Sequence, residues 1–341
     1  MIMEKLRVGF IGCGRHATKN LYPSLHYAPI YLVSVCDIDE KKARRNASWF
    51  GAEKYYTDYR EMLEKEKFDA VFIVCSPNMH KEISIDVLSK GYHIFLEKPP
   101  AINLAGIEEI NKASIQSGKT VMVGMMKRFT PIYNKIKKII HSTAFGEPNM
   151  VEAKFCVGPT KGAGYALLLD SGIHMLDLVT YLLGDVANVS FKKYQLDSLN
   201  SSYAIILQFV SGAVGTICIS DQQSWMRANE RVEITGQGSW ITAENLIRYF
   251  YFSPTNKVEF WEPGFSIPND ENQSLFLCGY VNEVRYFAES IISGKVPEPG
   301  LEQIYKTVSI IKQIEPKENY YKEPQNYIHW ESENSWLNVN K

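Results

Sequence analysis

The sequence shows no excess of charge of either sign and no cysteine or histidine pattern that would hold a metal. It has 341 residues, with 37 lysines and arginines against 38 aspartates and glutamates, so no net field attracts nucleic acid or an anionic membrane. Its six cysteines lie far apart without a C-x-x-C pair, and they indicate buried thiols. The seven histidines make no H-E-x-x-H spacing. We therefore expect no metal, no nucleic acid and no membrane partner, and a small molecule as the ligand.

Long hydrophobic runs are missing as well. No uninterrupted apolar run reaches the about 18 residues that cross a membrane, and the first apolar segment is too short and too soon interrupted by glycines for a signal peptide. We expect a cytoplasmic protein. A content of 45% hydrophobic and 22% charged residues is typical of a folded globular chain. The length suits two domains, and the segment after Glu315 predicts no particular element.

In residues 1–125, short apolar runs alternate with segments that carry helix start and stop signals. Asp39 and Asp58 can cap helices, and Gly51 and Gly91 can end them. The apolar runs read LRVGFI, YLVSVC, DAVFIVC, YHIFLE and TVMVG. Continuously apolar strands spaced by helices predict a parallel sheet covered on both faces. We therefore predict an α/β Rossmann domain with a doubly wound parallel sheet.

Residues 126–341 have a different pattern, with long β-prone runs. The clearest half-buried strand alternates apolar residues at Tyr203, Ile205, Leu207 and Phe209. One helix, SGIHMLDLVTYLLGD, is stopped by Gly184. The pattern predicts a C-terminal α+β domain with a large, mostly antiparallel open sheet, which would bind substrate.

Two strands of this second domain, YAIILQFV and GAVGTICIS, carry apolar residues on both faces. A sheet face that is apolar on the side away from the core is covered by something else. We expect a homo-oligomer, a dimer or a tetramer, formed through that face.

The stretch VGFIGCGRHATKN holds Gly12, Gly14 and Ala17 in the order G-x-G-x-x-A, after a strand and at the start of a helix. Gly12 would allow the turn, Gly14 the approach of a pyrophosphate to backbone N–H groups, and Ala17 the packing of helix on strand. A glycine turn that only lets strand and helix pack is the alternative. Asp37 follows 23 residues beyond Gly14 at the end of the second strand, and this context favours a dinucleotide site.

Asp37 also bears on which dinucleotide binds. A carboxylate there accepts hydrogen bonds from both ribose hydroxyls of NAD and repels the 2′-phosphate of NADP. Arg44 and Arg45 lie on the following helix and could offset this repulsion, although a charged run of this kind is usually a solvated helix face. The sequence favours NAD and leaves NADP possible.

Two longer stretches carry further motifs. The first, CSPNMHKEISIDVLSKGYHIFLEKPPA, contains S-P-N-x-H and E-K-P, and the second, LDSGIHMLDLVTYLLG, contains D-x-G-x-H-x-x-D. In this order, with the glycine loop before them and the strand RVEITGQGSWIT after them, they resemble the glucose–fructose oxidoreductase, inositol dehydrogenase and MocA family (Gfo/Idh/MocA) over nearly the whole chain. The resemblance implies NAD(P)-dependent oxidation of an alcohol, or the reverse reduction, on a sugar or cyclitol.

Carried over to this sequence, the family's catalytic residues are Lys98, Asp170 and His174. The chemistry agrees, because hydride loss from a carbinol carbon requires a base for the hydroxyl proton and a cation beside the developing alkoxide. His174 titrates near physiological pH, and Lys98 can supply charge or share the proton. Asp170, four residues earlier on the same helix face, can orient the imidazole or bind a substrate hydroxyl, and Asp177 extends that face. An amphipathic helix with a satisfied histidine is the alternative.

The predicted cofactor contacts come from the glycine loop and from the carboxyl ends of the strands. They are Gly12, Gly14, Arg15, His16, Ala17, Asp37, Ser76, Pro77, Asn78, His80, Glu97 and Lys98. Of these, His80 is equally consistent with no role at the site. The resemblance also suggests a cis peptide between Lys98 and Pro99, since X–Pro bonds tolerate cis at little cost.

The predicted substrate contacts lie at the junction of the domains. They are Lys98, Arg128, Tyr165, Asp170 and His174. A surface salt bridge is the alternative role for Arg128. Many members of the family carry three glycines before the aspartate, where this chain has Gly164, Tyr165 and Ala166. Tyr165 would narrow the pocket or stack on a sugar ring, so the substrate cannot be borrowed from another member.

Taken as a whole, the sequence predicts an NAD-dependent oxidoreductase that moves a hydride between nicotinamide and a hydroxyl or keto carbon of a sugar, sugar derivative or cyclitol. Two alternatives stay open. One is a redox-assisted glycosidase that keeps its NAD, and the other is a non-catalytic binder that senses NAD or sugar. Retention of Lys98, Asp170 and His174 argues against the binder.

Overall fold

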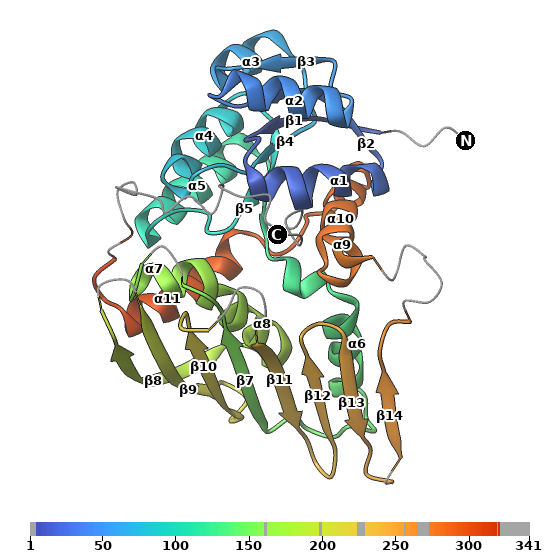
Figure 1. Cartoon of the computed structure of the whole chain (residues 1–341), viewed down its shortest axis with the longest axis vertical. Helices are drawn as coiled ribbons and strands as arrows, with labels where there is room; N and C mark the ends of the chain where they lie inside the picture. The colour runs from blue at the N-terminus through green and yellow to red at the C-terminus, as the bar shows by residue number, and fades with distance from the viewer. Residues whose placement is uncertain are drawn as a thin grey trace, which may run out of the picture.

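The N-terminal part of the chain forms a six-stranded parallel sheet in the order β3-β2-β1-β4-β5-β6 (Figure 1). The computed structural model describes residues 5–159, 162–197, 200–223, 229–255, 257–264, 273–318 and 320. The strands are β1 (Leu6–Ile11), β2 (Ile30–Cys36), β3 (Lys54–Tyr56), β4 (Ala70–Ile73), β5 (His93–Glu97) and β6 (Val121–Gly124). The chain order reverses between β1 and β4, and ligands of doubly wound sheets bind at the carboxyl ends of strands beside such a switch.

The helices of this part are α1 (Tyr22–Ser24), α2 (Glu40–Phe50), α3 (Tyr59–Lys65), α4 (Pro77–Ser89) and α5 (Leu104–Ser117). Two of them, α2 and α3, begin where the sequence predicts. Asp39 caps α2 by accepting from the N–H groups of Lys41 and Lys42, and Gly51 ends it in the left-handed conformation. Asp58 caps α3 in the same way. The predicted doubly wound α/β fold is therefore confirmed.

The rest of the chain forms an eight-stranded sheet in the order β14-β13-β12-β11-β7-β10-β9-β8. Its strands are β7 (Met150–Cys156), β8 (Val186–Gln195), β9 (Ser201–Phe209), β10 (Val214–Ser220), β11 (Asn229–Thr235), β12 (Trp240–Glu244), β13 (Arg248–Phe252) and β14 (Val258–Trp261). The pair β7 and β10 is parallel, and the other neighbours are antiparallel. This confirms the predicted, mostly antiparallel α+β domain.

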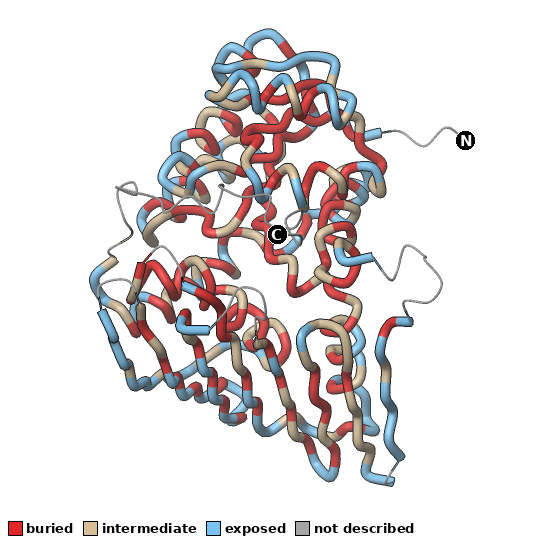
Figure 2. The backbone as a smooth tube through the Cα atoms, viewed as in Figure 1, coloured by how far each residue is buried: buried red, intermediate tan, exposed pale blue. Residues whose placement is uncertain are grey.

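Helices cover one face of the large sheet and leave the other open (Figures 1 and 2). The helices of this half are α6 (Pro131–Ile140), α7 (Tyr165–Leu167), α8 (Ile173–Leu183), α9 (Ser274–Leu277), α10 (Tyr280–Ile292) and α11 (Leu301–Ile314). Helices α6, α8 and α11 contact β12, β7 and β8. On β9 the predicted alternation is confirmed, with Tyr203 3% exposed on the covered face and Ile206 55% exposed on the open one.

The helical segment Tyr165–Leu183 corrects one prediction. It has 19 residues and is long and apolar enough to cross a membrane by length and composition. The sequence prediction overlooked it because Asp170, His174 and Asp177 interrupt the apolar run. Of an 18-residue window of this helix, 72% is buried inside the protein, as expected for a core helix that packs on a sheet.

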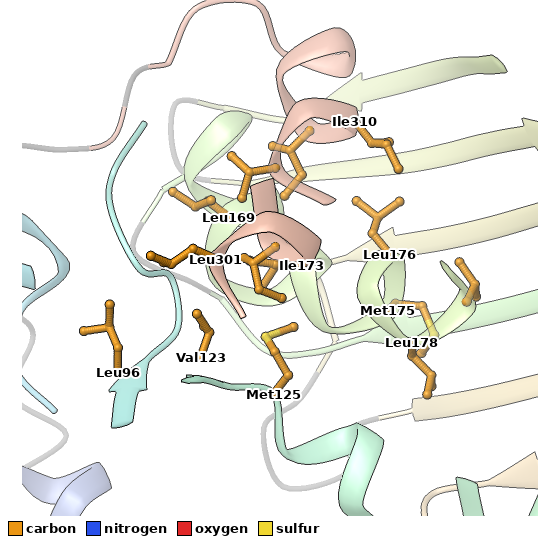
Figure 3. Close-up of a cluster of buried hydrophobic side chains, with 14 of the residues drawn as sticks. Leu96, Val123, Met125, Leu169, Ile173, Met175, Leu176, Leu178, Leu301 and Ile310 are labelled. Atoms are coloured by element: carbon orange, nitrogen blue, oxygen red, sulfur yellow. The ribbon is translucent and has the colours of Figure 1, made fainter. Parts of the chain in front are cut away.

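Apolar packing joins the two halves of the molecule. Helix α10 lies against the first sheet, where Phe287 meets the rings of Phe72 and Phe95 edge-on. A second cluster joins Leu96 and Val123 of the first sheet to Ile173 and Leu301 of the helices on the second sheet (Figure 3). Because protein interiors are close-packed, this cluster fixes the end of β5 relative to the start of α8.

Candidate active site

The glycine loop leaves a space beside the start of the first helix. Gly12 has a φ of 106°, and a Cβ there would lie 2.0 Å from the carbonyl oxygen of Val74, the residue after β4. A Cβ on Gly14 would meet nothing within 4 Å. The helix begins at Arg15, and the first N–H groups of a helix have no partner within it. The loop therefore fits an incoming pyrophosphate, as the sequence predicts.

Asp37 lies directly against this loop. Its carboxylate accepts from the backbone N–H of Cys13 at 2.7 Å and from that of Asp39 at 2.9 Å. Arg45 donates to the carbonyl oxygen of Cys13 at 3.2 Å, whereas Arg44 is paired with Glu40. The half-buried carboxylate at the end of β2 therefore fits the ribose of NAD and gives a 2′-phosphate an unfavourable neighbour.

The start of α4 lies across the switch point from the glycine loop. Ser76 precedes this helix without a side-chain cap hydrogen bond, and Pro77 is its first residue. Ser76 and Asn78 are exposed beyond the carboxyl end of β4. His80 is only 1% exposed, and its ring nitrogens face the carbonyl oxygens of Cys75 and Pro99. His80 thus ties α4 to the turn that carries Lys98.

A buried carboxylate connects the glycine loop to that same turn. Glu97 Oε1 lies 3.0 Å from Nε2 of His16, and Oε2 accepts from the backbone N–H of Lys98 at 2.8 Å. Although burial acts in the opposite direction, the charges and hydrogen bonds of His16 and Lys98 hold the pKa of Glu97 below its usual value. His16 and Glu97, both predicted cofactor contacts, therefore lie together at the edge of the predicted nucleotide site.

Lys98 reaches from the first sheet to the second half of the chain. The predicted cis peptide between Lys98 and Pro99 is confirmed. The Lys98 ammonium donates to the backbone oxygen of Asp170 at 2.7 Å. The sequence predicts a regular helix at Asp170, but residues Leu168–Gly172 form a π-helical turn that leads into α8. Such turns are frequent at functional sites. The Asp170 carboxylate accepts from the hydroxyl of Tyr320 at 3.0 Å.

His174 lies in the first turn of α8 and is held neutral by its surroundings. Burial lowers its pKa well below the usual histidine value of 6.5, and the positive charges of Lys98, Lys127 and His16 lower it further. Its Nδ1 is shielded from solvent and has no hydrogen-bond partner among the described residues. A neutral imidazole beside ammonium groups is suited to accept a proton.

Lys127 is a cation that the sequence analysis missed. It is 3% exposed, forms an ion pair with Glu230, and its ammonium lies 4.5 Å from the ring centroid of Phe155. Phe155 in turn meets His174 edge-on, with the ring centroids 6.5 Å apart. Tyr133 donates to the second oxygen of Glu230 at 2.7 Å. The only signal in the sequence was the position of Lys127 next to Arg128, at the junction of the domains.

The structure places Arg128 and Tyr165 in the interior. Arg128 forms two hydrogen bonds with the carboxylate of Asp177, at 2.7 and 2.6 Å, and both side chains are buried. This ion pair is internal, unlike the surface salt bridge considered as the alternative. Tyr165 is 2% exposed, and its hydroxyl has no partner among the described residues. Lys98 thus contacts the backbone of Asp170 and acts on His174 through its charge, while Arg128 is bound to Asp177.

Family models match both halves of the chain. Residues 6–125 match the oxidoreductase family with an NAD-binding Rossmann fold (GFO_IDH_MocA), and residues 133–242 match the GFO/IDH/MocA C-terminal domain. The matches cover more than half of the sequence and agree with the resemblance carried by the motifs.

Curated relatives extend the same comparison. The myo-inositol 2-dehydrogenase of Thermotoga maritima is 26% identical over 258 residues, which cover 71% of this chain and 76% of that protein. The NAD(+)-dependent scyllo-inositol 2-dehydrogenase of Bacillus subtilis is 28% identical over 315 residues, which cover 86% of this chain and 88% of that protein.

Solved structures confirm the fold. A dehydrogenase from Chromobacterium violaceum superposes with a TM-score of 0.84 at 22% identity, covering 92% of this chain and 95% of that one. An oxidoreductase from Agrobacterium radiobacter, solved with NAD+, L-tartaric acid and magnesium, superposes with a TM-score of 0.78 at 19% identity. The latter match covers 90% of this chain and 94% of that one.

Proposed function

The chain belongs to the GFO/IDH/MocA family of NAD-dependent oxidoreductases acting on CH–OH groups, and from this premise we propose that its substrate is an inositol or a closely related polyol. Support comes from the two relatives named as inositol dehydrogenases, each aligned over more than two thirds of this chain. The observation that carries the proposal is the bond from Lys98 to the backbone of Asp170, which sets an ammonium group beside the neutral His174.

NAD, when bound, accepts the hydride of the substrate carbon or returns it in the reverse direction. The chain's own residues then have to manage one proton and one developing negative charge. We assign the proton to His174, whose depressed pKa leaves the imidazole free to accept it at neutral pH. Lys98 stabilises the alkoxide as it forms, and the Asp170 carboxylate receives a second hydroxyl of the polyol. Each role uses a group that the packed junction already holds in place.

The first experiment measures NADH formation with a panel of inositols, sugars and glycosides. We expect turnover with an inositol, with NAD preferred over NADP and with free NADH released in each cycle. Retention of reduced cofactor together with glycoside cleavage would instead support the glycosidase alternative, and binding without turnover would support the non-catalytic binder.

The second experiment tests the roles of His174 and Lys98. His174→Ala and Lys98→Ala should each lower kcat by about 10²–10⁴-fold with little change in NAD affinity, the usual effect of losing a positioned acid/base group. The double variant should lose less than the product of the two effects, because both groups serve one proton transfer. His141→Ala, at an exposed histidine, is the matched control. Near-normal turnover of His174→Ala would refute the assignment.

We also propose that copies of the chain associate through the open face of the large sheet. Met150, Ile206 and Val214 lie on that face and are 37%, 55% and 48% exposed. Val214 is opposite Met150 on the neighbouring strand, so these two apolar groups are adjacent. Contiguous exposed apolar surface of this kind favours association. Light scattering should give the mass of an oligomer for the native chain and a smaller mass for Ile206→Lys; a monomeric native chain at micromolar concentration would refute the proposal.

A further inference from the structure

The chain continues from α11 into a segment that is tied to the second sheet. Glu315, the residue after α11, accepts from the ammonium of Lys193 at 2.6 Å and from the hydroxyl of Tyr203 at 2.5 Å. Lys193 and Glu315 are partly shielded from solvent, and Tyr203 is buried. Hydrogen bonds to a carboxylate are stronger than neutral ones, so the start of the segment is fixed.

The same segment then reaches the first domain. Glu318 accepts from the backbone N–H of Leu104, the first residue of α5, at 3.2 Å, and its other oxygen lies 3.5 Å from the ammonium of Lys312. The backbone N–H of Tyr320 donates to the carbonyl oxygen of Glu318 at 3.1 Å. The segment therefore crosses the junction between the halves and is attached on both sides of it.

The crossing brings Tyr320 to the candidate active site. Its ring packs partly buried against the main apolar core, and its hydroxyl donates to Oδ1 of Asp170 at 3.0 Å. The backbone oxygen of the same aspartate binds Lys98. Asp170 thus connects the ammonium group of the first domain with a tyrosine from the far end of the described chain.

We propose that Tyr320 is a positioning residue of the active site, which fixes the carboxylate of Asp170 for binding a substrate hydroxyl. A carboxylate turns about its last side-chain bond unless its oxygens are held, and the phenol holds one of them. This orients the group before substrate arrives, so less rotational freedom is lost on binding. The inference rests on the proposed function, because it assigns Tyr320 to the same polyol site.

The test removes the hydroxyl and keeps the ring. Tyr320→Phe should lower kcat/KM for the polyol by about 10- to 100-fold, the range for losing a hydrogen bond to a charged group, and leave NAD affinity unchanged. Tyr305→Phe is the matched control, because Tyr305 packs on the same core and donates to a carboxylate, that of Glu108, at 2.7 Å. Equal kinetics for Tyr320→Phe and the native enzyme would overturn the proposal.

A double-mutant cycle separates positioning from general support of the fold. If Tyr320 acts through Asp170, Tyr320→Phe should change kcat/KM by less than about twofold once Asp170→Asn is present. An equal fold-loss of kcat/KM in the native and the Asp170→Asn backgrounds would overturn the proposal and assign Tyr320 to structural support alone.

One further measurement is independent of the substrate. In a crystal structure of the full chain with NAD bound, the Tyr320 hydroxyl should lie within hydrogen-bond distance of Asp170. Tyr320 elsewhere would overturn the inference even if inositol oxidation is established. If no polyol in the panel is oxidised, the proposed substrate fails, while the same bond in the crystal would still support Tyr320 as a part of the site.

Discussion

Breaking the ion pair between Arg128 and Asp177 should destabilise the protein without removing a substrate contact. The guanidinium makes two short hydrogen bonds to a carboxylate that is 0% exposed, and it lies 4.9 Å from the ring centroid of Tyr181. Arg128→Met keeps most of the side-chain volume but leaves Asp177 buried without its partner. Removing one member of a buried pair costs about 3–5 kcal/mol, so we expect a loss of that size in the free energy of unfolding.

The assay is denaturant unfolding combined with steady-state kinetics. The double variant Arg128→Met with Asp177→Leu should recover most of the lost stability, because replacing both charges by apolar groups is often neutral. Arg60→Met is the control, since Arg60 is 54% exposed in its ion pairs and such pairs contribute at most about 1 kcal/mol. A raised KM for the polyol with unchanged unfolding of Arg128→Met would refute this reasoning and restore Arg128 as a substrate contact.

Three further predictions concern charge. Because burial and neighbouring cations lower the pKa of His174, the acidic limb of kcat/KM for polyol oxidation should lie below the usual histidine value of 6.5; a limb at or above 6.5 would contradict this. Asp37→Ser should weaken the binding of NAD more than that of NADP and so narrow the ratio of their dissociation constants. An unchanged ratio would show that Asp37 is not part of the cofactor site. Burial raises the pKa of Glu283 above its usual 4.5. The unfolded chain therefore gives up this proton first as pH rises, and stability falls above about pH 4.5. Glu283→Gln should raise the melting temperature more at about pH 8 than at about pH 5. Glu289→Gln, at an exposed residue of the same helix, should leave the melting temperature nearly unchanged at both pH values.

The features that the sequence predicted correctly depend on neighbours along the chain. The Gly12 turn needs a positive φ, and a side chain there would strike the carbonyl oxygen of Val74, so the residue type itself reveals the geometry. Asp39 caps a helix through N–H groups two and three residues ahead. The alternation on β9 follows from a strand with one covered face. For the cap and the alternation the physical cause lies within a short window of sequence, and for Gly12 the residue type alone carries the signal.

The features that sequence reasoning missed join distant segments. Lys127 is paired with Glu230, which is 103 residues away, and Tyr320 donates to Asp170, which is 150 residues away. Neither residue lies in a periodic pattern or a motif that would distinguish it from a surface side chain. The ion pair of Arg128 with Asp177, which is 49 residues away, was likewise not visible in the sequence, where only the position of Arg128 at the junction could be seen.

The protonation state of His174 shows why this difference matters for chemistry. The imidazole is kept neutral by burial and by the ammonium groups of two separate segments, Lys98 at the end of β5 and Lys127 after β6. A histidine at this point of an isolated helix would titrate near its usual value and would be partly charged at neutral pH. The motif therefore specifies which group carries the proton, whereas the packed junction between the two halves determines that this group is ready to accept it.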